Sequence, residues 1–322
     1  MTLDVIIPAY NAHDTIDKAL ASIAMQKIDE GDEIQIVIVD DCSTDGGYHD
    51  CARYWAAQGL NVGVAERKTN GGCGQARQTG MDVTDGEGIF FLDADDVVGS
   101  PFALRIMMDG LKLGYDVVMG QFIEETPKHT FITHEANWIW MHGKAYSRKF
   151  LKEHDIRFNA TRYNEDVGFN SLVNKLTENV LYVPQITYVW ENREDSTVRT
   201  DHNAYAYDHG WLQFLENMAW ATAELEKRNI PNEVIGEHLS AVIARLYWNS
   251  MDAHEAVPAV EKKNWSALQK FYETAAKKYA DSGVVTPETL RAAYFKVAEQ
   301  TPMASVPYMT YDGFLKKLGF KG

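Results

Sequence analysis

The sequence predicts an α/β fold, in which an open, mostly parallel sheet is followed by an all-helical C-terminal region. Two observations lead to this prediction. Up to about residue 200, short apolar runs alternate with segments of helical periodicity, which is the βαβα order of a parallel sheet. After about residue 203, long helical patterns replace this alternation. With 322 residues, 45% of them hydrophobic, the chain can bury one substantial core and a second, smaller one.

The first predicted strand is the apolar run at residues 5–7. A helix follows it, because apolar residues such as Ile16 and Leu20 repeat at helical spacing. Asp14 is placed to cap that helix. The run IQIVIVDD at residues 34–41 is almost wholly apolar, as expected for a strand covered on both faces of a parallel sheet. Further strands are expected at residues 61–66, 88–93 and 116–122.

The second half of the chain shows long helical patterns separated by prolines. Thr286 and Pro287 are typical of an N-cap followed by proline at the first helical position. We therefore expect two domains, residues 1–202 with the sheet and residues 203–322 with helices alone. The predicted helices lie at residues 204–228, 233–252, 258–280 and 287–300.

Charge and cysteine usage disfavour several classes of protein. The net charge of −15 argues against broad affinity for nucleic acid or anionic lipid, although it leaves room for a local basic groove. Cys42, Cys51 and Cys73 have neither the spacing of a zinc site nor the even count of a secreted disulfide framework. No segment approaches the roughly 18 apolar residues that span a bilayer. We expect a cytoplasmic protein that meets a membrane, if at all, peripherally from the water side.

Two predicted strands end in acid pairs, at the edge where open α/β sheets bind ligands. IQIVIVDD supplies Asp40 and Asp41, and FFLDADD supplies Asp93 and Asp95. In extended chain, residues two apart point to the same side, so Asp93 and Asp95 can aim at one point. Converging carboxylates repel each other unless a cation lies between them, and Mg²⁺ or Mn²⁺ completed by substrate phosphates suits such a site. The alternative is a polar turn that caps the following helix.

Between the acid pairs lies a glycine-rich segment, NGGCGQARQTG. A dinucleotide-binding fingerprint needs a third glycine where this segment has Arg77, so the fingerprint fails. What remains is a glycine turn that leads into a helix, whose N-terminus and Arg77 can meet a diphosphate or steady the acid cluster. The glycines fit a loop with positive φ angles in either case.

Two further polar groups follow. Glu165 and Asp166 stand at the start of a helical pattern, where the helix dipole lowers the cost of negative charge. The alternative is that they form only the first turn of that helix. The segment WENREDSTVR at residues 190–199 offers cations and hydroxyls just before the helical half, and alone it is an ordinary polar loop.

The order of these motifs is more specific than any one of them. Over residues 3–200 the chain carries, in order, VIIPAYN, VDDCSTDG, NGGCGQARQTG, FLDADD, HGKAYSRKFL, YNEDVGF and YVWENREDSTVR. This succession resembles the family-two glycosyltransferases of soluble bacterial or bacteriophage type. The resemblance implies the GT-A fold, a Rossmann-like fold that binds nucleotide-diphospho-sugars, and it does not extend to the helical half.

For the first motifs, the resemblance implies contacts with the nucleotide. Pro8, Ala9 and Tyr10 would border the base, and Asp41, with Asp40 beside it, would hold the base or the ribose. These five positions form the expected nucleotide pocket.

For the later motifs, the resemblance implies a metal and diphosphate centre beside a catalytic base. Arg77 would lie near the diphosphate and Asp93. Asp93 and Asp95 match the DxD motif, whose second aspartate is the usual ligand of Mn²⁺ or Mg²⁺. Glu165 and Asp166 match the ED motif, in which the aspartate is the general base.

The resemblance also implies a flexible loop that closes over the donor phosphates. Arg193 and Ser196 fall in that loop. The chain has Trp190 and Glu191 where tyrosine and arginine are frequent in the family, so Arg199 competes with Arg193 for the phosphate contact. A milder departure is Arg-Gln-Thr-Gly in the glycine segment, where Arg-Asn-x-Gly is usual.

The resemblance implies an inverting, metal-dependent enzyme that moves a sugar from a donor, most readily a UDP-sugar, to a hydroxyl of a glycan or cell-surface polymer. A nucleotidyltransferase is disfavoured, because PAYNAHDT lacks the basic phosphate loop of that class. Two alternatives stay open, a non-catalytic sugar-nucleotide binder and a phage-type enzyme acting on modified DNA bases. The helical half can shape the acceptor site, form a homo-oligomer or attach the enzyme to a partner.

Overall fold

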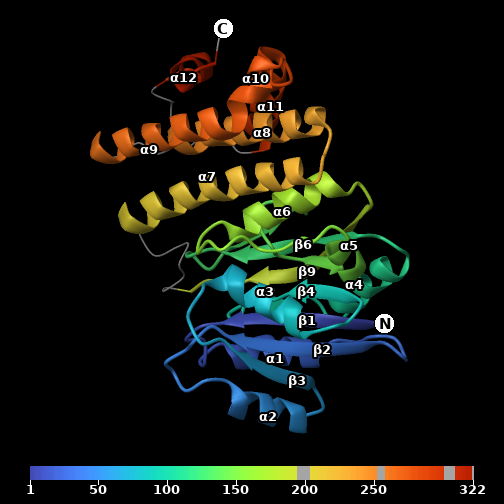
Figure 1. Cartoon of the computed structure of the whole chain (residues 1–322). Coiled ribbons are helices and arrows are strands. Elements are labelled where there is room, and N and C mark those ends of the chain that lie inside the picture. Colours follow the sequence, from blue (N-terminus) through green and yellow to red (C-terminus); the bar gives the residue numbers. More distant parts are fainter. Residues whose placement is uncertain (194–203, 252–257, 301–308, 321–322) are drawn as a thin grey trace. The chain divides into compact units, whose positions relative to one another are not determined.

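The computed structural model describes residues 1–193, 204–251, 258–300 and 309–320 (Figure 1). The chain divides into two compact units, Met1–Asn203 and Ala204–Gly322. Each unit has buried apolar residues of its own. Among the described residues, no helix combines the length and the apolar character that crossing a bilayer requires.

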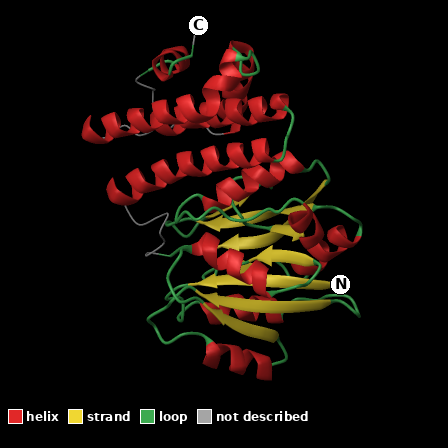
Figure 2. Cartoon of the chain, in the orientation of Figure 1, coloured by secondary structure: helices red, strands yellow, loops and turns green. Residues whose placement is uncertain are grey.

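The first unit is built on a mostly parallel sheet of nine described strands, which confirms the predicted α/β class (Figure 2). In chain order the strands are β1 (Thr2–Ala9), β2 (Glu33–Asp40), β3 (Asn61–Glu66), β4 (Gly88–Phe91), β5 (Val97–Val98), β6 (Val117–Glu125), β7 (Phe131–His134), β8 (Lys144–Ser147) and β9 (Val180–Trp190). Strands β3, β2, β1 and β4 lie in this order and run parallel. β8 is inserted antiparallel between β4 and β6, and β9 runs parallel to β6. The short strands β5 and β7 are antiparallel to their neighbours.

Helices cover both faces of this sheet. They are α1 (Ile16–Ala24), α2 (His49–Ala57), α3 (Cys73–Val83), α4 (Ala103–Lys112), α5 (Arg148–Glu153) and α6 (Glu165–Leu176). α1 and α4 pack against one face, where Val5 joins Leu20 and Leu104 in a single apolar core. On the opposite face α3 lies so close to β1 that a Cβ atom at Gly80 would collide with Ile6. Because both faces are covered, β1 and the second half of β2 are buried without alternation, as their continuous apolar runs predict.

Three predicted details of the secondary structure are wrong. Asp14 does not cap α1, because the N–H groups of Thr15 and Ile16 both donate to the Ala12 carbonyl and leave Asp14 exposed. The strand predicted at 88–93 ends at Phe91, because the chain turns directly afterwards. The single helix predicted at 258–280 is three segments, α9 (Pro258–Phe271), the π-helical turn η1 (Tyr272–Ala276) and α10 (Lys277–Asp281).

The second unit consists of helices throughout its described residues. Besides α9, η1 and α10 they are α7 (Ala204–Lys227), α8 (Asn232–Met251), α11 (Pro287–Gln300) and α12 (Tyr311–Leu318). Tyr247 of α8 contacts the rings of Tyr294 and Phe314, so α11 and α12 close over α8 in one aromatic core. The predicted cap is confirmed, since the Thr286 hydroxyl accepts the Thr289 N–H at 3.3 Å. α12 was not predicted.

A buried ion pair joins the start of the sheet to α5. The Asp4 carboxylate is fully buried and accepts from Arg148 and from the Gly86 N–H. Arg148 also donates to the Gly86 and Met81 carbonyl oxygens at 2.6 and 2.8 Å. The guanidinium therefore neutralises a carboxylate that has no access to water. It also donates a hydrogen bond to each of two backbone carbonyl groups.

We expect Arg148→Met to destabilise the protein by about 3–5 kcal/mol, because it leaves the Asp4 charge buried without a partner. Arg157→Met is the matched control, since Arg157 pairs with Asp82 on the surface at 2.8 Å and such pairs are worth about 1 kcal/mol or less. Urea denaturation of both variants measures the difference. Equal losses in the two variants would contradict the assignment of Arg148.

Candidate functional site

The carboxyl ends of β1 and β2 bring the first predicted site residues together. Ala9 lies opposite Asp40 in the parallel ladder, and the Asp41 N–H donates to the Ala9 carbonyl oxygen at 2.8 Å. Pro8 is the preceding residue of β1, and Tyr10 follows the strand with 51% of its surface exposed. An exposed aromatic residue at a strand end can stack on a flat ligand.

Asp41 holds the glycine-rich loop. Its carboxylate accepts the N–H groups of Gly71 and Gly72 at 2.9 and 2.7 Å, and the Nε–H of Arg67 at 2.7 Å. Gly72 has a φ of +85°, a backbone conformation that favours glycine. Asp40 instead accepts the Ser43 N–H at 2.8 Å. Both predicted nucleotide aspartates therefore fix the loops that border the edge of the sheet.

Arg77 connects two of the predicted acidic motifs. Its side chain is 4% exposed, and it donates to Asp93 Oδ1 at 2.6 Å and to Glu165 Oε1 at 2.9 Å. Burial alone would raise the pKa of Asp93, but the Arg77 charge outweighs it and holds that pKa below the ordinary value. The sequence predicts that Arg77 meets a diphosphate or steadies the acid cluster, and the ion pair with Asp93 is a contact of the second kind.

The DxD segment is a turn rather than extended chain. The Asp96 N–H donates to the Asp93 carbonyl oxygen at 3.1 Å, so the argument that residues two apart share a side does not apply. Asp95 instead lies 3.5 Å from the Arg193 guanidinium. Burial and the neighbouring Asp93 charge raise the pKa of Asp95.

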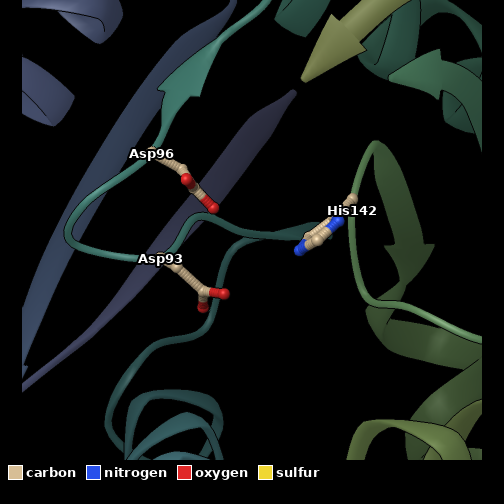
Figure 3. Close-up of side chains that lie close together, drawn as sticks. All are labelled: Asp93, Asp96 and His142. Carbon is tan, nitrogen blue, oxygen red and sulfur yellow. The ribbon is translucent and has the colours of Figure 1, made fainter. Parts of the chain in front are cut away.

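Asp96, the third acid of the segment, is the most buried of the three at 2% exposure. It accepts the Tyr188 hydroxyl at 2.6 Å and the Glu191 N–H at 2.8 Å. Burial, with the charges of Asp95 and Asp93, raises its pKa well above the usual range. His142 faces Asp93 and Asp96, and burial lowers the pKa of its ring to about 3, so the ring is neutral (Figure 3).

The ED pair lies at the first turn of α6. The residue before it, Asn164, has a φ of 59°, and its side chain does not cap the helix. Burial raises the pKa of Asp166, and burial together with the Asp166 charge raises the pKa of Glu165 to about 7. A Cβ atom added at Gly74 would lie 2.5 Å from Glu165 Cγ, so α3 packs directly against this turn. Buried Lys144, with a pKa lowered to about 7 by burial, supplies positive charge to Asp166.

Sequence reasoning missed three residues of this edge, Arg67, Asp96 and His142. The third acid of FFLDADD was a signal for Asp96, and the motif HGKAYSRKFL, which begins at His142, was a signal for that residue. Arg67 lies in a segment without a recognisable motif. The predicted site residue Ser196, with its neighbour Arg199, lies outside the described residues.

The acids at this edge fit a divalent cation. Asp93 and Asp95 keep 27% and 35% of their side chains exposed, so both can reach a ligand. Burial raises the pKa of Asp95 and the Asp93 charge raises it further, and a cation relieves repulsion of this kind. Carboxylate oxygens are the ligands that Mg²⁺ and Mn²⁺ prefer.

Comparison with protein families gives a match over half of the chain. The family model described as "Glycosyl transferase family 2" covers residues 4–164. Poly(ribitol-phosphate) beta-N-acetylglucosaminyltransferase TarS of Staphylococcus aureus is 31% identical over 173 residues, which are 49% of this chain and 30% of that protein. Poly(ribitol-phosphate) beta-glucosyltransferase of Bacillus spizizenii is 30% identical over 172 residues, 49% of this chain and 27% of that protein. The chain thus matches less than a third of the length of these relatives.

Solved structures extend the likeness to nearly the whole chain. The crystal structure of residues 1–349 of S. aureus TarS in complex with UDP-GlcNAc superposes with a TM-score of 0.72 at 19% identity. The superposition covers 94% of this chain and 93% of the TarS chain. At this identity the likeness concerns the fold, and it includes helices beyond the sheet.

Proposed function

The chain belongs to glycosyl transferase family 2, and on that premise we propose that it moves a sugar from a nucleotide-diphosphate donor to a hydroxyl group of a glycan or polymer acceptor. The fold is the GT-A fold. We assign catalysis to residues 1–202, and we propose that residues 203–322 serve acceptor binding or homo-oligomer formation.

One observation carries this proposal, the buried Arg77 that holds Asp93 and Glu165 at one edge of the sheet. A donor diphosphate needs positive charge and a metal site, and acceptor activation needs a base close by. Arg77 joins Asp93 to Glu165, and Asp166 is the neighbour of Glu165 in the first turn of α6. The proposed base is therefore close to the proposed metal site.

In the proposed mechanism, Asp166 removes the proton from an acceptor hydroxyl while the hydroxyl oxygen attacks the anomeric carbon. The bond between that carbon and the diphosphate oxygen breaks on the opposite face, so the configuration inverts. Arg77 stabilises the developing negative charge, and Arg193 can approach the phosphates from its place beside Asp95. A divalent cation held by Asp93 and Asp95 would neutralise charge on the leaving diphosphate.

A UDP-sugar is the donor we propose, since a structure of the same fold was solved with UDP-GlcNAc bound. Pro8, Ala9 and Tyr10 would border the base, and Asp40 and Asp41 would order the loops around the ribose. The two relatives named above carry names that specify poly(ribitol-phosphate), which supports a polymer hydroxyl as the acceptor.

Asp166→Asn tests the mechanism. Loss of the general base should lower the rate of sugar transfer by about 10²–10⁴-fold and leave the affinity for UDP unchanged. The control is Glu178→Gln, which alters an exposed acid just beyond the other end of α6 and should keep full activity. Rates come from UDP release with a screened acceptor, and affinities come from calorimetry. Transfer by Asp166→Asn at the wild-type rate would remove Asp166 from the mechanism.

The pH dependence of transfer is a second test. A general base works only when deprotonated, and burial raises the pKa of Asp166. The rate should therefore fall on acidification, with its midpoint above the ordinary pKa of aspartate, about 3.9. A profile of kcat/KM against pH measures this midpoint. An acid limb at or below the ordinary value would show that the base is not a buried carboxylate.

Donor choice and metal use can be measured together. UDP, GDP and other nucleoside diphosphates are titrated into the full chain by calorimetry, with Mn²⁺ and with a chelator. UDP should bind tightest, and the chelator should weaken its binding, because Asp93 and Asp95 would hold a cation whose charge offsets that of the phosphates. Equal binding of UDP with the chelator would count against the metal role.

A further inference from the structure

Lys144 is a buried cation that no step of the proposed mechanism uses. It is the first residue of β8 and is 1% exposed. Its ammonium group donates to the Trp140 carbonyl oxygen and, at 3.3 Å, to that of His142. Among the residues that the structure describes, no carboxylate lies within ion-pair distance of it. A buried ammonium group without a counterion beside it is costly, so its position calls for a reason.

A shared hydrogen-bond acceptor places Lys144 against α6. The side-chain amide of Asn170 donates to the same Trp140 carbonyl oxygen at 3.0 Å. Asn170 is fully buried, and its own oxygen accepts the Tyr146 hydroxyl at 2.7 Å. Asn170 comes four residues after Asp166, so both side chains lie on one face of the helix. The Lys144 ammonium group is therefore close to the face of α6 that carries the proposed base.

The electrostatic effects agree with this placement. Burial lowers the pKa of Lys144 to about 7, and the charge of Asp166 opposes that decrease. Burial raises the pKa of Asp166, and the charges of Arg77 and Lys144 oppose that increase. Arg77 is bonded to Asp93 and Glu165, whereas Asp166 is the acid whose charge acts on Lys144. Lys144 and Asp166 therefore each favour the charged form of the other.

Several neighbouring elements present titratable groups to Asp166. They are Arg77 and Cys73 of α3, Asp93 of the turn after β4, Lys144 and Tyr146 of β8, and Glu165 of α6 itself. Burial raises the pKa of the Cys73 thiol and of the Tyr146 hydroxyl well above their ordinary values, so both stay neutral. Asp93 and Glu165 are bonded to Arg77. The charge of Lys144 is therefore one that a substitution can remove without touching the Arg77 contacts.

We propose that Lys144 is a positioning residue for the base, which keeps Asp166 ionised and fixes residues 140–142 against α6. This rests on the proposed function, which assigns Asp166 as the base that accepts the proton of the acceptor hydroxyl. The ionised carboxylate is the form that can accept this proton. Because Lys144 is almost completely buried, it acts through Asp166 and does not contact the substrate.

Lys144→Met tests this role through the pH profile of transfer. Methionine is of similar length but carries no charge, so the acid limb of kcat/KM should move up by about one pH unit. The rate should fall about tenfold on the acidic side and recover as the pH rises. Lys152→Met, on the exposed surface of α5, is the matched control and should leave the profile unchanged. A loss of rate that is equal at every pH would show a purely structural role and overturn the proposal.

A measurement without turnover tests the same pair, whether or not Lys144→Met folds. The full chain is labelled with ¹³C at the lysine ε-carbons, and NMR follows each signal as the pH changes. One lysine should titrate near pH 7, well below the ordinary value of about 10.4. In Asp166→Asn that midpoint should fall, because the neighbouring negative charge is gone. By linkage, the fall should equal the rise that Lys144→Met causes in the midpoint of Asp166.

Circular dichroism checks that each variant folds. An unchanged lysine midpoint in folded Asp166→Asn overturns the proposal. So does a wild-type chain in which every lysine titrates near the ordinary value.

The two measurements separate this inference from the proposed function. A lysine midpoint that falls in Asp166→Asn, in a protein that turns over no nucleotide-sugar, would retain the pair of Lys144 and Asp166 and end the transferase proposal. Turnover together with an unchanged lysine midpoint would leave the transferase proposal intact and end this one.

Discussion

The buried guanidinium of Arg77 is the interaction on which the rest of the site depends. It bonds Asp93, 16 residues away in the chain, and Glu165, 88 residues away. Without it, two partly dehydrated carboxylates would face each other, and their repulsion would separate the strand-end turn from α6. The Arg77 guanidinium thereby fixes the distance between the two acidic motifs. Gly74 contributes by letting α3, which carries Arg77, approach Glu165.

The parallel part of the fold could be predicted from the sequence, because strands covered on both faces are continuously apolar. β1 and β2 are of this kind, and they place Ala9 and Asp40 side by side as the motif order implied. β8 could not be predicted, since its four residues carry no period and its neighbours are distant in the chain. Tertiary pairing decides such short strands.

At the site, the residue types were predictable but their directions were not. The rule that residues two apart share a side holds for extended chain, and it fails at Asp93 and Asp95 because one hydrogen bond closes a turn. Asp41 carries the acid expected next to the nucleotide, yet its oxygens are bonded to Gly71 and Gly72. Which partner a carboxylate takes depends on loop geometry, and local sequence does not encode it.

The reversed strand β8 has a consequence for how this site can diversify. In a purely parallel sheet, only the segments that follow strands reach the ligand edge. β8 runs against β4, so the residues that precede it, His142 among them, meet the turn that follows β4. The ligand edge is therefore built from residues that precede a strand as well as from residues that follow one. Changes in residues 135–143 can recompose one wall of the site while the strand order stays as it is.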